Sequence, residues 1–453
     1  MKYHIKTYGC QMNHSDSERI AGVLEMAGYE KTAEESEADL IVINMCSVRK
    51  SAVDRIAGNF KKYKKYKINN PNFKTVITGC VLKSDRKRFE KLFDLVLDIK
   101  EIESLPERIK KCHCEGVKTT EAIPKLQFNE PNNEIATLYT VVRNDNSNYF
   151  HIQPQHQSKI TAYVPIMTGC NNFCSYCVVP YTRGREKSRA VDEILNEIRK
   201  LIKSGYKEII LLGQNVNSYK PDKNTDFPKL LRLINNIPGN FWIRFLTSHP
   251  KDVTKELIKT VAKCDKCTEY IHLALQSGDD DILQKMNRKY TTEHFLNIVK
   301  MIRRYIPNCA ITTDIIVGFP TETEKQFQNT IELMKKVKFD MVYINKYSPR
   351  AGTESYKMKD DVSWTEKKKW EVIANKILRE TALENNQKYI GETIKILVEK
   401  VDDKFIYGKT RSFKNVKLEL EIKNQELIIN NGKFVKIKIT QTDAWGLEGK
   451  MIK

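Results

Sequence analysis

Three short runs rich in β-branched residues occur near the amino terminus, at Tyr3–Tyr8, Asp39–Asn44 and Lys74–Thr78. Such runs are typical of strands. After the first run, apolar residues recur at the spacing of one helix face until a glycine ends the pattern, at Ile20, Val23, Leu24, Ala27 and Gly28. Strands that alternate with helices predict a parallel sheet. We therefore expect residues 1–111 to form an amino-terminal parallel α/β domain.

The pattern changes twice further along the chain. From 112 to 158 it gives way to Asn, Pro, His, Gln and Thr, which predicts a linker or an insertion. From 159 to 388 strand-like and helix-like segments alternate again. The expected strands are Ala162–Met167, Glu208–Leu212, Phe241–Leu246, Tyr270–Leu275, Ala310–Val317 and Met341–Ile344. The expected helices are the apolar face from Val191 to Ile202, then Asp252–Lys263, Thr291–Tyr305, Thr323–Val337 and Thr365–Tyr389. This succession predicts a partial (β/α)6 barrel, with its chemistry at the carboxyl ends of the strands.

Residues 389–453 have a different texture. Apolar and polar residues alternate in two stretches, at Ile394, Ile396 and Val398 and again at Val435, Ile437 and Ile439. Glycines punctuate the segment, at Gly391, Gly408, Gly432, Gly446 and Gly449. Alternation with a period of two residues, interrupted by turn signals, predicts a small antiparallel β-barrel.

Composition narrows the class of protein. Of the 453 residues, 40% are hydrophobic and 30% charged, which is typical of a folded protein with two or three domains. The net charge of +20 favours a polyanionic partner, and a general bias toward Lys would give the same charge. No stretch approaches the roughly 20 apolar residues that span a bilayer. The polar start, Met1–Lys6, does not resemble a signal peptide. We expect a cytoplasmic protein with no membrane partner.

Three of the eleven cysteines stand close together, at Cys170, Cys174 and Cys177. Three thiolates just after the first predicted barrel strand could hold three irons of a [4Fe–4S] cluster and leave the fourth without a protein ligand. The open iron would bind S-adenosylmethionine and cleave it to a radical, so these are the candidate catalytic residues. The alternatives are a structural zinc site or a redox pair, but zinc usually takes four protein ligands, commonly in two pairs.

A second set of cysteines follows the three amino-terminal strands, at Cys10, Cys46 and Cys80. Since the carboxyl ends of parallel strands share one edge of a sheet, these thiols could converge. They could then hold a second [4Fe–4S] cluster. Buried free cysteines are common, so the spacing leaves that reading open as well.

Several segments resemble one family, the radical-SAM tRNA methylthiotransferases of the MiaB type. They are Lys6–Asn13, Asn44–Arg49, Thr78–Cys80, Gly169–Glu186, Asn287–Tyr290 and Asp314–Pro320. The resemblance covers nearly the whole chain, with 112–158 as the main gap. Met45 departs from the family's usual threonine and leaves the neighbouring cysteine in place. The resemblance implies a radical-SAM core, an RNA-binding TRAM-like tail, and an auxiliary cluster held by Cys10, Cys46 and Cys80.

The resemblance also implies an activity and partners. It implies methylthiolation of carbon 2 of N6-isopentenyl-adenosine next to the anticodon of tRNA, with Cys170, Cys174 and Cys177 for radical generation and the auxiliary cluster for sulfur delivery. An electron donor of the flavodoxin or ferredoxin type and an iron–sulfur or sulfur carrier protein are the further partners. The alternatives are methylthiolation of threonylcarbamoyl-adenosine in tRNA or of a ribosomal protein, and a non-catalytic iron–sulfur regulator that binds RNA.

Loops after the barrel strands are candidate cofactor contacts. Glycine lets the backbone approach a ligand, and Gln or Ser side chains can hydrogen-bond a ribose. The candidates are Gly213, Gln214, Asn215, Gln276, Ser277, Gly318 and Glu322. Without a barrel, the ordinary occurrence of such residues in loops and turns would explain them equally well.

Candidate RNA contacts fall in two places. Arg183, Arg185 and Arg189 follow the cysteine loop and could bind phosphate oxygens, or they could belong to a solvated loop. Phe413 and Trp445 in the tail could stack on bases, although Trp445 could instead fill the barrel. Two shorter motifs, Cys112–Cys114 and Cys264–Cys267, lack a second pair of ligands at zinc spacing, and we expect no role for them. Cys309 is expected in the core.

Overall fold

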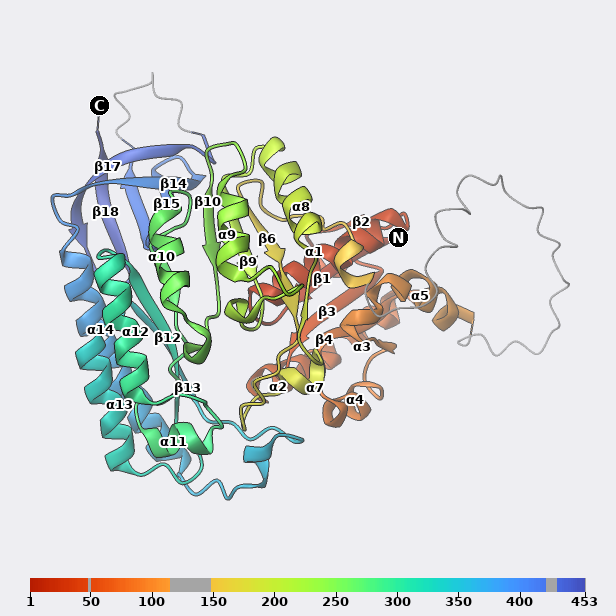
Figure 1. Ribbon diagram of the computed structural model, residues 1–453. Helices are drawn as coiled ribbons and strands as arrows, with labels where there is room; N and C mark the ends of the chain where they lie inside the picture. The colour runs from red at the N-terminus through yellow and green to blue at the C-terminus, as the bar shows by residue number, and fades with distance from the viewer. Residues whose placement is uncertain (48–49, 115–147, 421–429, 453) are drawn as a thin grey trace, which may run out of the picture. The chain divides into compact units, whose positions relative to one another are not determined.

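The computed structural model describes residues 1–47, 50–114, 148–420 and 430–452. The chain divides into two compact units, residues 1–155 and residues 156–453 (Figure 1). Within the described residues, no helix is both long and apolar enough to cross a membrane.

The first unit is built on a five-stranded parallel sheet. Its strands, in the order in which they pair, are β2 (Glu30–Lys31), β1 (Lys2–Thr7), β3 (Leu40–Cys46), β4 (Lys74–Cys80) and β5 (Leu95–Val96). The three strands that the sequence predicts are the three in the middle, so the parallel α/β prediction is confirmed. The two edge strands are only two residues long, too short to leave a periodic signal in the sequence.

Helices cover the sheet and continue into the segment expected to be a linker. They are α1 (Gln11–Met26), α2 (Lys50–Gly58), α3 (Phe60–Asn69), α4 (Lys83–Phe89) and α5 (Leu105–Cys114), with 3-10 turns at Glu35–Glu37 and Ile99–Ser104. A third 3-10 turn, Asn148–His151, contains Tyr149, whose hydroxyl hydrogen-bonds the buried Asp16 carboxylate of α1. Tyr149 and Ile152 pack in the same core cluster as Leu24. The end of the 112–158 segment is thus part of the first unit's core.

The second unit contains six parallel barrel strands. They are β6 (Thr161–Pro165), β9 (Glu208–Leu212), β10 (Trp242–Phe245), β11 (Tyr270–His272), β12 (Ala310–Val317) and β13 (Met341–Lys346). Two three-stranded sheets, β6-β9-β10 and β11-β12-β13, meet through parallel bridges such as Ser248 to Leu273. Among the described residues, no ladder pairs β6 with β13, so the barrel is open on that side. The predicted partial (β/α)6 barrel is confirmed.

Helices lie outside the barrel strands (Figure 1). They are α7 (Val179–Thr182), α8 (Val191–Lys203), α9 (Phe227–Asn235), α10 (Lys255–Lys263), α11 (Asp280–Lys285), α12 (Thr292–Tyr305), α13 (Glu324–Val337) and α14 (Trp364–Gln387), with 3-10 turns at Val216–Ser218, Pro250–Asp252 and Glu354–Lys357. Their starts are set by side chains that accept a backbone N–H, as Thr254, Thr291 and Ser363 do. A two-stranded ribbon, β7 (Met167–Thr168) with β8 (Lys187–Ser188), closes the loop that carries the first cysteine cluster.

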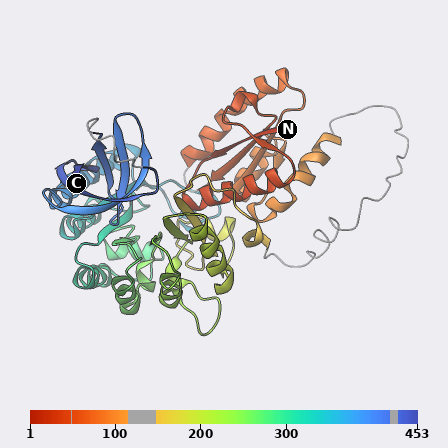
Figure 2. The same ribbon diagram turned by 90° about the horizontal axis from the view of Figure 1, so that it is seen from above.

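The carboxy-terminal segment is a closed five-stranded barrel, drawn in blue in Figure 2. In order, its strands are β14 (Thr393–Val401), β15 (Phe405–Thr410), β16 (Asn415–Glu419), β18 (Gly446–Met451) and β17 (Phe434–Thr442). Four pairs are antiparallel, as predicted, but β16 and β18 are parallel. Strand directions cannot alternate all the way round a closed ring with an odd number of strands, so one parallel pair is required.

Buried charges attach this barrel to the partial (β/α)6 barrel within the second unit. Arg244 of β10 is fully buried, pairs with Glu208 at 2.8 Å and donates to the Arg411 carbonyl at 2.9 Å. Its guanidinium also lies 4.2 Å from the ring centre of Phe413. In turn, Arg411 pairs with Glu269. The barrel is therefore held to the core by hydrogen-bonded ion pairs as well as by apolar contact.

Candidate functional site

Cys10, Cys46 and Cys80 lie at the carboxyl ends of three neighbouring strands of the first unit. Cys46 and Cys80 are the last residues of β3 and β4 and are direct register partners. Strand β1 pairs with β3 on the other side, and Cys10 follows it by three residues. Cys80 is buried, Cys46 half-buried and Cys10 exposed. The structure brings this predicted set of thiols to one edge of the sheet.

Two buried amides connect the loops that carry Cys10 and Cys46. The Asn13 Oδ1 atom accepts the backbone N–H of Cys10 at 3.3 Å and its thiol at 3.5 Å. The Asn13 Nδ2 atom donates to Asn44 Oδ1 at 3.1 Å and to the Met45 carbonyl at 3.2 Å. Asn44 donates back to the Asn13 carbonyl at 2.7 Å. These residues lie inside the motifs Lys6–Asn13 and Asn44–Arg49, but the sequence alone predicts no role for them.

Gly79 brings β4 close to the same amides. Its φ is +99°, and a Cβ at this position would lie 2.4 Å from Asn44 Oδ1 and 2.4 Å from the Met45 carbonyl oxygen. No side chain fits in that space, so glycine is required for Cys80 to pair with Cys46.

The thiols at this edge suit a cluster better than a single ion. Thiolates that bind one zinc ion at about 2.3 Å lie about 3.8 Å from each other, so a single ion requires three sulfur atoms in near contact. In agreement, no three His, Cys, Asp or Glu side chains of the described chain are gathered closely enough to hold one metal ion. Three thiols on three loops match the ligand set of a [4Fe–4S] cluster with one open iron.

Cys170, Cys174 and Cys177 lie in a loop between the ribbon strands β7 and β8. Gly169 enters the loop with φ +73°, and a Cβ there would lie 2.1 Å from the Arg185 carbonyl oxygen. The Cys170 N–H donates to the Gly184 carbonyl at 3.2 Å, and the Cys177 N–H donates to the Cys174 carbonyl at 2.9 Å. The glycines at both ends therefore close the loop tightly around its three thiols.

The thiols of Cys170, Cys174 and Cys177 lie close enough to affect one another's ionisation. Burial is the main cause that raises the pKa of the Cys170 thiol. Burial also raises the pKa of the Cys177 thiol, by more than that of Cys170. Repulsion from the other thiolates of the set adds to both shifts. A cationic iron cluster would remove this repulsion, so the donor set fits such a group.

Arg288, for which the sequence predicts no role, contacts one thiol of the set Cys170, Cys174 and Cys177. The Arg288 Nη1 atom lies 3.3 Å from Cys174 Sγ, and its Nη2 atom donates to the Ala274 carbonyl at 2.6 Å. Beside it, Asn287 Nδ2 donates to the Phe173 carbonyl at 2.8 Å. The motif that contains these residues thus fixes the cysteine loop to the segment that follows β11. In the sequence, Asn287 and Arg288 belong to the Asn287–Tyr290 segment that resembles the family.

The loop after β9 contains a predicted cofactor contact that also hydrogen-bonds the next loop of the fold. A Cβ on Gly213 would lie 2.5 Å from Met167 Cγ, which places this backbone against the start of the cysteine ribbon. Asn215 is buried, and its amide donates to Asp252 at 2.7 Å and accepts the His249 N–H at 3.1 Å. Gln214 is half-buried. Of the three predicted cofactor contacts here, Asn215 therefore also holds the next loop in place.

The loop after β11 begins at Gln276 with a left-handed backbone. Its φ is +74°, although it is not glycine, and its N–H donates to the Asp314 carbonyl at 2.8 Å. Ser277 is buried, and its hydroxyl accepts the Asp279 N–H at 3.3 Å. A non-glycine residue in this conformation is strained, and such strain is concentrated at functional sites.

The loop after β12 is closed by its own carboxylate. Glu322 is buried and accepts the backbone N–H of Gly318 at 2.6 Å and of Phe319 at 3.1 Å. Burial raises the pKa of Glu322 to about 7, and the two backbone hydrogen bonds oppose that rise. Gly318 has φ +70°, and a Cβ there would lie 2.3 Å from Lys367 Cγ. Glu322 thus shapes the turn that it was predicted to share with the cofactor.

The predicted RNA contacts differ in exposure. Arg183 and Arg189 are buried, and Arg189 pairs with Glu193. Arg185 is exposed, with its guanidinium 4.5 Å from the ring centre of Phe173. In the terminal barrel, Phe413 packs on Arg244 and on Tyr270, whose ring centre is 5.1 Å away. Trp445 is 47% exposed, so it does not fill the barrel.

The other cysteine motifs lie apart from these two sets. Residues 112–114 end helix α5, and their side chains lie outside the described residues. Cys264 and Cys267 are buried at the end of α10. Cys309 is half-buried.

Three family models match the chain. Residues 164–334 match the Radical SAM superfamily, residues 387–452 match the TRAM domain, and residues 2–98 match the uncharacterized protein family UPF0004. The partial barrel, its cysteine loop and the terminal barrel thus define a radical-SAM enzyme with a TRAM domain. Such an enzyme implies bound S-adenosylmethionine and a [4Fe–4S] cluster.

Similar curated proteins identify the family. The chain is 41% identical over 467 residues to the tRNA-2-methylthio-N(6)-dimethylallyladenosine synthase of Clostridium novyi, with 100% of this chain and 96% of the relative covered. It is 41% identical to the synthase of the same name from Thermoanaerobacter pseudethanolicus, with 99% and 92% covered. The chain belongs to the radical-SAM methylthiotransferase family that contains these synthases.

Solved structures agree with the fold. The radical S-adenosylmethionine methyltransferase TsrM from Kitasatospora setae, solved with tryptophan and a SAM analog, superposes with a TM-score of 0.50. The alignment has 14% identity and covers 76% of this chain and 72% of that one. The same methyltransferase solved with cobalamin and a [4Fe–4S] cluster gives the same values. At this identity the likeness shows the fold alone.

Proposed function

We propose that this chain is a tRNA-2-methylthio-N6-dimethylallyladenosine synthase, which attaches a methylthio group to carbon 2 of N6-isopentenyl-adenosine in tRNA. The observation that carries the proposal is the convergence of Cys10, Cys46 and Cys80 at one sheet edge, in a chain of the methylthiotransferase family. A radical-SAM enzyme needs one cluster to make its radical, and a second set of three thiols supports a separate source of sulfur.

Cys170, Cys174 and Cys177 would hold the first cluster, and Cys10, Cys46 and Cys80 the second. When bound, the first cluster and S-adenosylmethionine supply a one-electron cleavage that yields a radical able to abstract the carbon-2 hydrogen of adenine. Arg288 supports the ligand loop by its contacts to Cys174 and the Ala274 carbonyl. Gly213, Gln214, Gln276, Ser277 and Gly318 are proposed to contact S-adenosylmethionine, because they follow the barrel strands at their carboxyl ends.

The outer face of β14, β17 and β18 is proposed to bind the tRNA backbone. Two lysine pairs lie directly opposite each other there, Lys395 with Lys436 and Lys438 with Lys450. All four side chains are exposed. Exposed lysines on one face of the barrel supply the positive charge that contacts phosphate oxygens. Exposed Trp445, at the start of β18, is positioned to stack on a base.

The proposed tRNA surface predicts two different effects. Lys438→Glu should weaken tRNA binding and lower its salt dependence, because a phosphate contact is lost. Trp445→Ala should cost about 1–3 kcal/mol of binding free energy with an unchanged salt slope, since stacking is not ionic. Filter binding at several salt concentrations measures both, with Lys335→Glu on α13 of the core as the control. Equal affinities for all four proteins would remove this surface from the proposal.

Two protein partners follow from the chemistry. Cleavage of S-adenosylmethionine consumes an electron, so a low-potential donor of the flavodoxin or ferredoxin type is proposed. Cys10, Cys46 and Cys80 would hold the group that supplies the inserted sulfur, and that sulfur would have to be replaced, so an iron–sulfur or sulfur carrier protein is proposed as a partner.

Iron content tests the two-cluster assignment. Anaerobically reconstituted protein should bind about eight irons per chain, and a Cys10→Ala/Cys46→Ala/Cys80→Ala variant about four. That variant should still form 5′-deoxyadenosine under reducing conditions, whereas Cys174→Ala should not. Cys309→Ala, which removes a thiol outside both sets, serves as the control. About eight irons in the triple variant would show that these thiols hold no cluster.

Nucleoside analysis tests the substrate. Mass spectrometry of tRNA from cells that lack the gene should show loss of 2-methylthio-isopentenyl-adenosine and accumulation of isopentenyl-adenosine. Loss of the methylthio group from threonylcarbamoyl-adenosine, or from a ribosomal protein, would move the assignment to one of those substrates. Failure to detect 5′-deoxyadenosine in any preparation would favour the non-catalytic RNA-binding regulator.

A further inference from the structure

The junction between the radical-SAM core and the terminal barrel contains a pair of thiols outside both cluster sets. Cys264 ends helix α10, and Cys267 precedes strand β11. The Cys267 N–H donates to the Cys264 carbonyl at 3.0 Å, so the four residues form a β-turn. Such a turn keeps its end Cα atoms within about 7 Å, a range that overlaps the 4.4–6.8 Å found across disulfides.

The pKa values of the two thiols are shifted in opposite directions. The neighbouring Cys267 thiol lowers the pKa of Cys264, whereas the Cys264 thiol and burial raise the pKa of Cys267. The positive charge of nearby Arg232 lowers the pKa of Cys264 further. A thiol of lowered pKa with a second thiol three residues away in the same turn is the arrangement of reactive Cys-X-X-Cys pairs.

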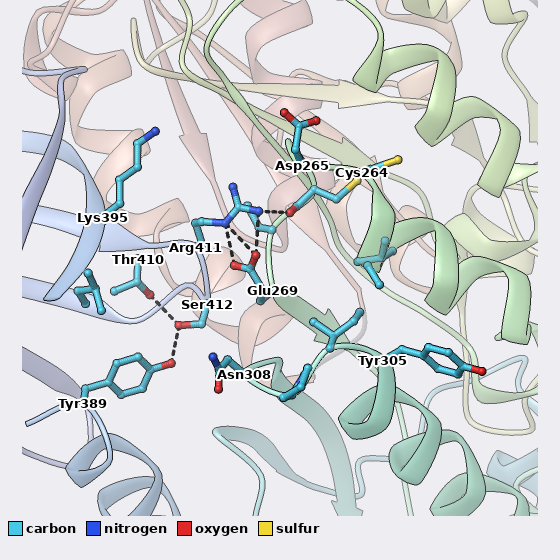
Figure 3. A pocket seen from close by; sticks show the side chains of 17 residues that line it. Cys264, Asp265, Glu269, Tyr305, Asn308, Tyr389, Lys395, Thr410, Arg411 and Ser412 are labelled. Carbon is cyan, nitrogen blue, oxygen red and sulfur yellow. Dashed lines mark hydrogen bonds and ion pairs between the residues drawn. The ribbon is translucent and has the colours of Figure 1, made fainter. Parts of the chain in front are cut away.

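The pair borders a cavity that a small molecule could enter. The cavity has a volume of about 410 Å³, and both cysteines line it. Figure 3 shows Cys264 and Asp265 on the core side and Thr410, Arg411 and Ser412 on the barrel side. Arg411 joins the two sides, because it pairs with Glu269 and donates to the Cys267 carbonyl. Cys264 is 7% exposed and Cys267 2%, so access favours attack by Cys264.

This pair does not belong to the cluster site of the barrel. It precedes β11, whereas the Arg288 contact to Cys174 is made beside Ala274, just after β11 ends. The two sites therefore lie at opposite ends of the same strand. In addition, no third His, Cys, Asp or Glu of the described chain joins the pair to enclose a metal ion. Thiol–disulfide exchange is the chemistry that suits two thiols held in one turn beside a cavity.

We propose that Cys264 and Cys267 form a redox-active dithiol that reacts with low-molecular-weight disulfides at the junction of the core and the terminal barrel. The Cys264 thiolate attacks one sulfur of the small disulfide, whose S–S bond breaks and releases one thiolate. Cys267 then loses its proton, attacks the Cys264 sulfur and releases the second thiolate. The protein gives up two electrons and two protons, and the small disulfide becomes two thiols. This site goes beyond the proposed tRNA modification.

The test uses the full-length protein with its clusters in place. After anaerobic treatment with oxidised glutathione, free thiols are alkylated and the protein is digested with trypsin without reduction. Because trypsin cuts after Lys263, Lys266 and Lys285, the disulfide joins residues 264–266 to residues 267–285. The joined peptides should form in the wild type and in Cys309→Ser, with the visible absorbance of the clusters unchanged. Separate, alkylated peptides in both proteins would overturn the proposal.

Single variants test the order of attack. Cys267→Ser should trap glutathione on Cys264, because no second thiol is present to displace it. In Cys264→Ser, glutathione uptake at Cys267 should be at least about ten-fold slower than uptake at Cys264 in Cys267→Ser, because burial limits access to the Cys267 sulfur. Equal uptake in the two variants would contradict the assigned roles and indicate two ordinary thiols. If Cys264→Ser or Cys267→Ser does not fold, the disulfide measurement on the wild type and Cys309→Ser still decides the proposal.

Discussion

Two buried amide side chains, Asn13 and Asn44, are the residues that order the sheet edge carrying Cys10, Cys46 and Cys80. They hydrogen-bond each other and reach Cys10 on one side and the Met45 carbonyl on the other. Neither amide is a ligand in the proposed cluster. Their role is to hold two ligand loops in one geometry, and a fully satisfied buried network is well suited to this.

Replacement of Asn13 should therefore affect one cluster selectively. In Asn13→Ala the iron content should fall from about eight to about four per chain, while 5′-deoxyadenosine formation is retained. In metal-free protein, iodoacetamide should alkylate Cys10 faster than in the wild type, because the hydrogen bond to its thiol is gone. Asn70→Ala is the control, since Asn70 bonds Asp39 at the other end of β3. A full complement of iron and unchanged alkylation would exclude the positioning role.

Glu322 makes the folding stability of the second unit depend on pH. Its pKa is raised to about 7 in the folded chain from 4.5, so the folded state holds this proton more tightly than the unfolded state does. Its contribution to stability is present below pH 4.5 and is lost as the pH rises toward 7. Each unit of pKa difference corresponds to about 1.36 kcal/mol, which gives an upper limit of about 3 kcal/mol.

Glu322→Gln should remove this dependence. Between pH 5 and pH 8 the thermal midpoint of the wild type should fall more than that of the variant, measured by calorimetry on protein with its clusters. Glu256→Gln, at an exposed position on α10, is the control. Parallel pH profiles for the wild type and Glu322→Gln would show that this carboxyl does not titrate as described.

At the scale of elements, strands and helices were largely predictable from local pattern. β3, β4, β9 and β12 were located within one or two residues, because buried parallel strands are continuous apolar runs bounded by turn signals. The two-residue edge strands and the six-residue helix α11 were not predicted, since such elements contain fewer than two full periods of the hydrophobic pattern. The pairing of β16 with β18 depends on closure of the whole barrel, which no local pattern contains.

Gly79 shows how one residue sets the approach of two strands. Gly79→Ala should destabilise the first unit and reduce iron to about four per chain, because the added methyl would lie 2.4 Å from Asn44 Oδ1 and the Met45 oxygen. Gly28→Ala is a matched control, because its φ is also positive, at +82°, but nothing lies within 4 Å of a Cβ there. It should cost about 1–2 kcal/mol from backbone strain alone and keep both clusters. Equal iron loss in both variants would refute the close-approach argument.

At the scale of the whole molecule, the second unit joins two domains through a buried charge. Arg244 and Glu208 are 0% and 2% exposed, and Arg244 also contacts the barrel residues Arg411 and Phe413. Removing one partner of a buried ion pair leaves the other uncompensated, which is usually costly. The position of the terminal barrel on the core thus depends on a residue that sequence analysis did not single out.

Arg244→Ala should destabilise the second unit by about 3–5 kcal/mol and expose the junction with the terminal barrel to proteases. Arg232→Ala, which removes an exposed pair with Glu256, should cost less than about 1 kcal/mol. Thermal unfolding and limited proteolysis measure both effects. A similar small shift in the two variants would mean that apolar contacts alone hold the barrel on the core.

The sequence alone determined the order of elements, the fold class and the two sets of candidate ligands, since periodicity and cysteine spacing are local properties. Tertiary structure decided which polar residues serve the fold. Asn215, Arg189 and Phe413 are candidates for binding, and each also has a partner on another element: Asp252 for Asn215, Glu193 of α8 for Arg189, and Arg244 of β10 for Phe413. Conversely, Asn13 and Arg288 gained roles because folding brings them to ligands on other segments. A residue's partners depend on the three-dimensional approach of segments, and no local pattern records that approach.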